Sequence, residues 1–154
     1  MYRLFFLLIG LLIPALTVSA QTPTDAVKAA VTQMFTAMRN ADSTALKACF
    51  APNARLQSVT TKSKDVQTTS VEEFASIIGK LPANAADERI EFGNISIDGT
   101  IASVWTPYRF YFKEQFHHCG ANSFQMVQLD GKWKIQYILD TRRMDDCGAD
   151  NAAK

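Results

Sequence analysis

The sequence has almost no net charge, because its 154 residues include 16 Lys and Arg against 15 Asp and Glu. Nucleic-acid-binding proteins need clustered positive charge to displace counterions, and polybasic membrane-surface modules need it as well. The balance therefore argues against both classes. Neither disorder nor a fibrous structure is expected at 47% apolar and 20% charged residues, and the length fits one ordinary domain without repeats or linkers.

Motifs for metal, phosphate or nucleophilic chemistry are also absent. The sequence contains no P-loop, no nucleophile elbow and no Cys-x-x-Cys pair. His117, His118 and Cys119 are adjacent, and three adjacent residues cannot surround one ion tetrahedrally. We therefore expect no metal site and no cofactor.

Long apolar runs are missing everywhere except at the N-terminus. Arg3 precedes an apolar stretch over residues 4–16, and Val18-Ser19-Ala20 has the small residues that a signal peptidase recognises. This pattern predicts a signal peptide over residues 1–20 and an exported protein, periplasmic or secreted, that does not contact the membrane after cleavage. An uncleaved anchor is the alternative, although the run is shorter than the ~20 residues that span a bilayer.

Only three cysteines are present. Cys49 lies on the apolar side of a short expected helix and is interpreted as a small buried hydrophobe. Cys119 and Cys147 lie among polar residues, and an exported protein permits a disulfide. We therefore favour a bond between Cys119 and Cys147, while the other two pairings stay open.

Helices are expected in the first half of the chain. Residues 22–40 combine a Thr-Pro start signal with one apolar stripe, which predicts a helix of about four turns. Residues 42–50 predict a short second helix, and the Thr- and Ser-rich residues 54–69 predict a polar hairpin. A capping box begins a third short helix over 70–79, with Gly79 expected to end it in a left-handed conformation.

Strands are expected over residues 88–143, which are rich in β-branched and aromatic side chains. Asp-Gly pairs at 98–99 and 130–131 mark tight turns between antiparallel strands. Pro107 implies a bulge or an edge position. Helices that are segregated from an antiparallel sheet define an α+β fold.

Three segments carry a resemblance to a known family. They are the capped first helix, FAPNARL at 50–56, and QMVQLDGKWKIQYILDTRR at 125–143. In this order they resemble the nuclear transport factor 2-like (NTF2-like) superfamily over residues 22–143. Within it, HCG followed by WKI and DTRR is most similar to the small exported bacterial proteins described as "putative lumazine-binding", near the SnoaL-like group. The domain is accordingly assigned to residues 21–144, followed by a polar tail at 145–154.

The resemblance implies a cone-shaped fold. Three N-terminal helices would pack on a strongly curved sheet, mixed but mostly antiparallel, with a pocket at one end. The superfamily includes steroid isomerases, dehydratases, cyclases, binding modules and dimerisation modules, so the fold alone selects no activity. A homodimer through the outer sheet face, which carries Trp105 and Tyr111, is a further expectation.

Strand alternation predicts which side chains point into the cone. Along residues 133–141 the odd-numbered positions form the apolar face, which would turn Tyr137 inward and Asp140 and Arg142 away unless the strand bulges. Nine of the 13 aromatic residues after position 20 lie between residues 105 and 137. They favour an aromatic-lined cavity, although such rings can also simply fill a core. The candidate ligand-binding residues are Phe35, Tyr108, Phe110, His118, Asn122, Phe124, Tyr137 and Arg142.

Polar candidates are fewer. His118 could act as acid, base or ligand donor, or be a histidine held at the edge of the core. Asp140 could act as a base and Arg142 could bind an anion, or both could form a structural ion pair with the tail. We find no inward carboxylate of the kind that a steroid-isomerase-type reaction requires.

These observations predict an exported protein that binds a small hydrophobic or aromatic molecule, most simply without catalysis. Two alternatives stay open. One is an enzyme of the isomerase, dehydratase or cyclase type that uses His118 and Asp140. The other is a homodimerisation scaffold.

Overall fold

The computed structural model describes residues 21–60 and 65–147. The predicted signal peptide at 1–20 and most of the predicted tail, 148–154, lie outside the described residues. Within the described ranges, no helix is long and apolar enough to span a membrane.

Three helices form where capping residues begin them. Helix α1 spans Pro23–Arg39, α2 spans Ser43–Ala48 and α3 spans Val71–Gly79, and their N-caps are Thr22, Asp42 and Ser70. Each cap side chain accepts a hydrogen bond from a backbone N–H of the first turn, which would otherwise have no partner. The expectation for Gly79 is wrong, because this residue ends α3 without a positive φ. A Cβ here would lie 3.0 Å from that of Ser43, so the glycine permits close packing of α3 on α2.

Seven strands form one mixed sheet with the order β2-β1-β7-β6-β5-β3, and β4 also pairs with β5. Among the strands of the described residues, β1 and β7 run parallel and the other pairs are antiparallel. This arrangement confirms the α+β fold. The strands are β1 (Phe50–Thr60), β2 (Gln67–Thr69), β3 (Ala86–Ile90), β4 (Ile95–Asp98), β5 (Ile101–Phe112), β6 (Gln115–Leu129) and β7 (Lys132–Arg142).

Pro107 lies in the middle of β5, opposite the interruption between β3 and β4. Its carbonyl accepts the N–H of Glu91 in the connecting segment. Because proline has no N–H to donate, this break in the neighbouring strand pair suits it. The irregularity expected at Pro107 is therefore found in the strands beside it.

A bulge in β7 changes which residues face the interior. Gln125 pairs with Tyr137 and Met126 with Ile135, so Gln136 is an extra residue on β7. An extra residue reverses the alternation beyond it. Ile135 is buried before the bulge, whereas Ile138 and Asp140 are buried after it. The inward orientation expected for Tyr137 is wrong, and its hydroxyl donates instead to Gln57 Oε1 at 2.6 Å.

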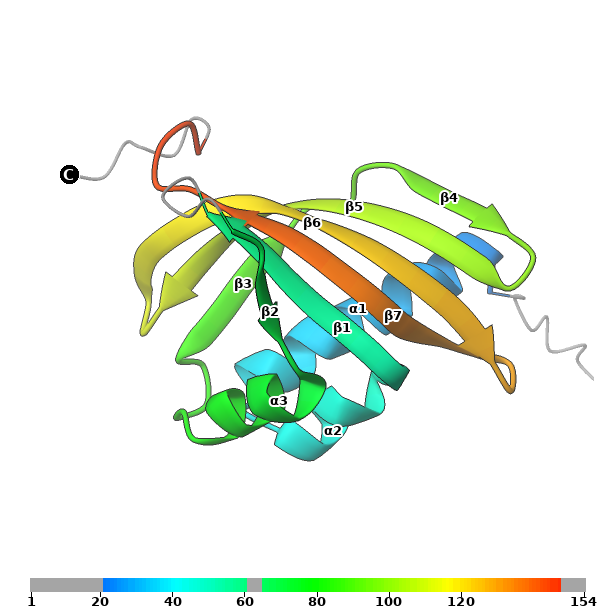
Figure 1. Ribbon diagram of the computed structural model, residues 1–154, viewed down its shortest axis with the longest axis horizontal. Coiled ribbons are helices and arrows are strands. Elements are labelled where there is room, and N and C mark those ends of the chain that lie inside the picture. Colours follow the sequence, from blue (N-terminus) through cyan, green and yellow to red (C-terminus); the bar gives the residue numbers. More distant parts are fainter. Residues whose placement is uncertain (1–20, 61–64, 148–154) are drawn as a thin grey trace, which may run out of the picture.

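The three helices lie on one side of the curved sheet (Figure 1). Helix α1 packs against β3, β4 and β7, and its Phe35 packs edge-on against Phe124 of β6 with ring centroids 6.0 Å apart. Cys49 is buried with a free thiol. The hydrophobic core between the helices and the sheet includes Val27, Val31, Leu46, Val104, Phe124, Met126 and Ile135.

Gly120 provides a test of the packing between β6 and the end of β7. A Cβ at this position would lie 1.8 Å from the carbonyl oxygen of Thr141 and 2.9 Å from the Tyr108 ring. Gly120→Ala should therefore lower the free energy of unfolding by about 3 kcal/mol or more. Gly99→Ala is the control, since Gly99 has φ +54 but open space around it, and should cost only about 1 kcal/mol. Urea denaturation measures both, and equal losses would contradict the packing described.

Candidate functional site

A cavity of about 370 Å³ opens between the helices and the inner face of the sheet. Most of its wall is apolar, because α1 and α3 contribute no polar side chain to it. The helix residues are Met34, Phe35, Met38, Phe74, Ile77 and Ile78. The strands supply the polar groups, which are Ser58, Thr69, Glu88, Tyr108, His118, Asn122, Asp140 and Arg142.

Asp140 is the centre of the first polar cluster and is only 8% exposed. Its Oδ2 accepts from Arg142 Nε at 2.8 Å, and its Oδ1 accepts from the Ser58 hydroxyl. The Tyr108 hydroxyl lies 3.3 Å from Oδ2 and donates to the Thr141 carbonyl at 2.9 Å. Burial, together with Glu88 and Asp140, raises the pKa of Tyr108, so this phenol stays protonated. The carboxylate is thus held by partners from three strands.

Glu88 forms a second polar cluster on the cavity wall. Its Oε1 accepts from Asn122 Nδ2 at 2.8 Å, and the same amide lies 3.3 Å from the hydroxyl of fully buried Thr106. Burial raises the pKa of Glu88 to about 7, and the negative charge of Asp140 adds to the increase, while the Asn122 hydrogen bond and Arg142 oppose it. Glu88 therefore exchanges a proton near neutral pH.

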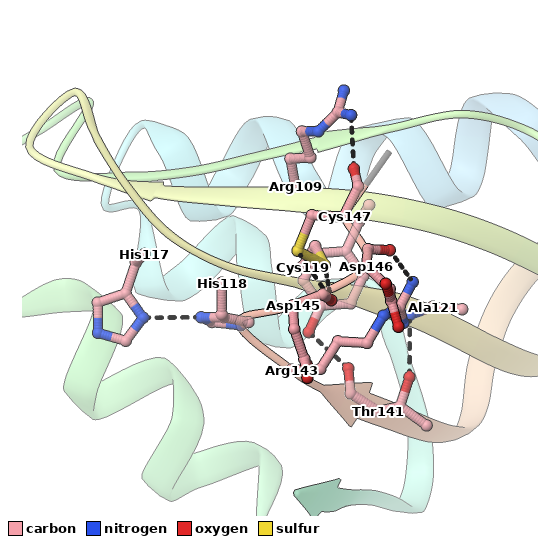
Figure 2. Close-up of a disulfide and its surroundings, with 11 residues drawn as sticks. Arg109, His117, His118, Cys119, Ala121, Thr141, Arg143, Asp145, Asp146 and Cys147 are labelled. Carbon is pink, nitrogen blue, oxygen red and sulfur yellow. Dashed lines mark hydrogen bonds between the residues drawn. A yellow bond between two sulfur atoms is a disulfide. The ribbon is translucent and has the colours of Figure 1, made fainter. Parts of the chain in front are cut away.

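A bulge in β6 places two neighbouring histidines together. Phe110 pairs with His118 and Tyr111 with Phe116, which leaves His117 as the extra residue. The Nδ1 atoms of the two imidazoles lie 2.8 Å apart (Figure 2). Burial, Arg142 and His117 lower the pKa of His118 to about 4, so this imidazole is neutral at pH 7. In the described structure, the hydrogen-bond partner of His118 is His117 and not a carboxylate.

The disulfide between Cys119 and Cys147 ties the segment after β7 to β6 (Figure 2). The backbones of Cys119 and Arg143 also exchange two hydrogen bonds of 2.9 Å. Arg109 Nη2 donates to the Cys147 carbonyl at 2.6 Å. These bonds fix the end of β7, from which Asp140 and Arg142 reach the cavity.

The structure brings most of the sequence-predicted candidates together. Phe35, Tyr108, Phe110, His118, Asn122, Asp140 and Arg142 line the cavity. Phe124 points inward but is part of the solid core, and Tyr137 lies on the opposite face of β7. Among the described residues, no group of three or more His, Cys, Asp or Glu could hold a metal ion. The homodimer stays a prediction, with Trp105 48% exposed.

Sequence reasoning missed Glu88, and the statement that no inward carboxylate exists is wrong. The signal was available in β3, where Glu88 shares the alternation of Ala86 and Ile90, an apolar pair that faces the helices. Ser58 was missed because residues 54–69 were expected to form a polar hairpin, in which a serine is not distinctive. Its neighbour two residues earlier, Leu56, lines the cavity and marks the inward face of β1.

Comparisons with known proteins agree with this geometry. Residues 22–137 match the family described as "putative lumazine-binding". An NTF2-like protein of unknown function from Shewanella baltica OS155 superposes with a TM-score of 0.63 at 16% identity, over 78% of this chain and 93% of that one. A ketosteroid isomerase-like protein from Erwinia carotovora atroseptica SCRI1043 gives 0.57 at 14% identity, over 76% and 93%. No curated protein matches the chain.

An NTF2-like protein of unknown function from Methylobacillus flagellatus KT gives a TM-score of 0.62 at 19% identity, over 82% of this chain and 96% of that one. At these identities the solved structures support the fold alone. The fold and cavity define an NTF2-like domain. Because the family match covers most of the sequence, the chain belongs to the "putative lumazine-binding" family.

The raised pKa of Glu88 predicts a pH-dependent stability. Between its ordinary value of 4.5 and about 7, the folded protein holds a proton that the unfolded chain has lost. The stabilisation from this group is complete below pH 4.5 and is lost as the pH rises through 7. Relative to Glu88→Gln, the wild type should lose stability on the order of 1–3 kcal/mol across this window.

Urea denaturation at several pH values measures this difference. Glu91→Gln is the control, because Glu91 is an exposed residue outside the cavity and should keep the wild-type pH profile. Parallel profiles for the wild type and Glu88→Gln would show that Glu88 titrates normally.

Proposed function

We propose that this protein binds a small, planar, largely apolar molecule in the cavity. The observation that carries the proposal is the division of the cavity wall, which is apolar along the helices and polar at the strand end. Ligand pockets of this size typically combine such a wall with a few polar groups that fix orientation. The Phe35, Phe74 and Phe110 rings provide faces for a flat molecule.

The family description supports a ligand of this kind. Lumazine is a flat bicyclic compound whose edge carries both hydrogen-bond donors and acceptors. Glu88 and Asn122 present a carboxyl and an amide at the polar end of the cavity. A heteroaromatic ring system with a donor–acceptor edge is therefore the ligand class that we favour.

Binding without catalysis is favoured over the reaction expected for a His–Asp pair. Such chemistry needs a carboxylate that orients the imidazole. Here Asp140 accepts from Ser58 and Arg142 and lies near the Tyr108 hydroxyl, whereas His118 contacts His117. Asp140 thus acts as the centre of a structural cluster.

We also propose that the protein is exported. The leader-like sequence at residues 1–20 supports this, and so does the disulfide between Cys119 and Cys147. Disulfides persist in oxidising compartments and are rare in the cytosol.

Native mass spectrometry of protein purified from its own host tests the binding proposal. We expect an additional mass of one small molecule that is released on denaturation. Leu56→Trp should reduce its occupancy about tenfold or more, because Leu56 lines the cavity and the larger side chain would fill it. Val59→Trp is the matched control, as Val59 alternates to the outer face of the same strand. Equal retention by both variants would place the molecule elsewhere.

A second candidate function is proton-transfer catalysis, which the pKa of about 7 at Glu88 favours. A carboxyl group with this pKa can remove and return a proton at neutral pH. The Tyr108 hydroxyl, which lies on the same cavity wall, would face an oxygen of the substrate.

Incubating the purified complex in deuterated water separates catalysis from binding. If Glu88 transfers protons to a carbon atom, the retained molecule should gain a carbon-bound deuterium in the wild type and none in Glu88→Gln. Mass spectrometry after back-exchange into ordinary water detects it. Retention without deuterium in the wild type would leave binding as the function and remove catalysis.

A further inference from the structure

We infer that the cavity selects uncharged or cationic ligands against anionic ones, and that Glu88 binds the donor group of the ligand. This inference rests on the proposed binding function. It narrows the ligand class from planar molecules in general to those with an N–H or ammonium donor and no carboxylate or phosphate at the polar end.

The charged groups of the cavity wall disfavour an anionic ligand. Helices α1 and α3 contribute only apolar side chains, and β1 and β2 contribute leucine, serine and threonine. The titratable groups on the described wall are Glu88 on β3, Tyr108 on β5, His118 on β6, and Asp140 and Arg142 on β7. Two carboxyl groups thus face one guanidinium, and Tyr108 and His118 are neutral at pH 7.

Arg142 already binds two side chains of the protein itself. Its Nε donates to Asp140 Oδ2 at 2.8 Å and its Nη2 donates to the Ser58 hydroxyl at 3.0 Å. The Nε–Nη2 edge of the guanidinium, one of the two edges that can bind a carboxylate bidentately, is therefore occupied by the protein's own groups. An anionic ligand would meet a guanidinium that Asp140 already neutralises, with Glu88 on the same wall.

Glu88 offers the ligand a hydrogen-bond acceptor. Its Oε1 accepts from Asn122, whereas its Oε2 has no hydrogen-bond partner within residues 21–60 and 65–147 and is not fully buried. This oxygen is therefore accessible from the cavity that Glu88 lines. As Glu88 ionises near pH 7, its attraction for a cation should increase.

Three probes with one ring system test the inference. They are 2-naphthylmethylamine, 2-naphthalenemethanol and 2-naphthoate, which are cationic, neutral and anionic at pH 8. Isothermal titration calorimetry gives their dissociation constants for the wild type, Glu88→Gln and Glu91→Gln. The last variant removes the same charge from an exposed site outside the cavity.

We expect the wild type to bind the amine most tightly and the naphthoate about tenfold or more weakly than the alcohol. Affinity for the amine should rise severalfold from pH 5 to pH 8. Glu88→Gln should lose both the preference and the pH dependence, while Glu91→Gln keeps them. Thermal unfolding confirms that each variant is folded.

The other outcomes separate the inference from the proposed function. Naphthoate binding as tight as that of the amine would overturn the charge selection while leaving the cavity as a binding site. An amine preference that survives in Glu88→Gln would overturn the role of Glu88. If the wild type binds none of the probes, both the charge selection and the binding of planar apolar molecules are contradicted.

Discussion

The extra residue in β7 is the constraint on which the cavity depends. Without the bulge at Gln136, a regular strand that buries Ile135 would also bury Tyr137 and turn Asp140 outward. With it, the carboxylate lies inside, where three neighbours hold it and Arg142 balances its charge. A buried charge is tolerated only when it is paired and hydrogen-bonded. The bulge and the cluster around Asp140 are therefore parts of one arrangement.

The two acidic residues of the cavity have different surroundings and therefore different chemistry. Asp140 accepts hydrogen bonds from Ser58 and Arg142 and forms an ion pair with the guanidinium. Glu88 has one amide donor, and its burial favours the neutral form of the carboxyl group. The cavity wall therefore combines a carboxyl group that is paired with a guanidinium and one, that of Glu88, whose pKa is raised to about 7.

Much of the fold was predictable from the sequence, because local signals determine it. Caps at Thr22, Asp42 and Ser70 mark the helix starts, and the Asp-Gly turn at 130–131 joins the last two strands. The site was less predictable, because its side chains depend on bulges that alternation cannot reveal. Gln136 and His117 are the extra residues at the two bulges, and both are residue types that also occur in regular strands. Glu88, in contrast, follows the regular alternation of β3 with Ala86 and Ile90 and was predictable from the sequence.

The parallel pairing of β1 with β7 has a consequence for how the protein acquires its shape. Ser58 and Asp140 are 82 positions apart in sequence, yet their side chains hydrogen-bond to each other. Contacts of such long range are slow to form, since the loop between them must first lose its freedom. The polar end of the cavity is thus assembled late, after nearly the whole polypeptide has emerged. A shortened chain ending before β7 would leave β1 paired with β2 but separated from the rest of the sheet.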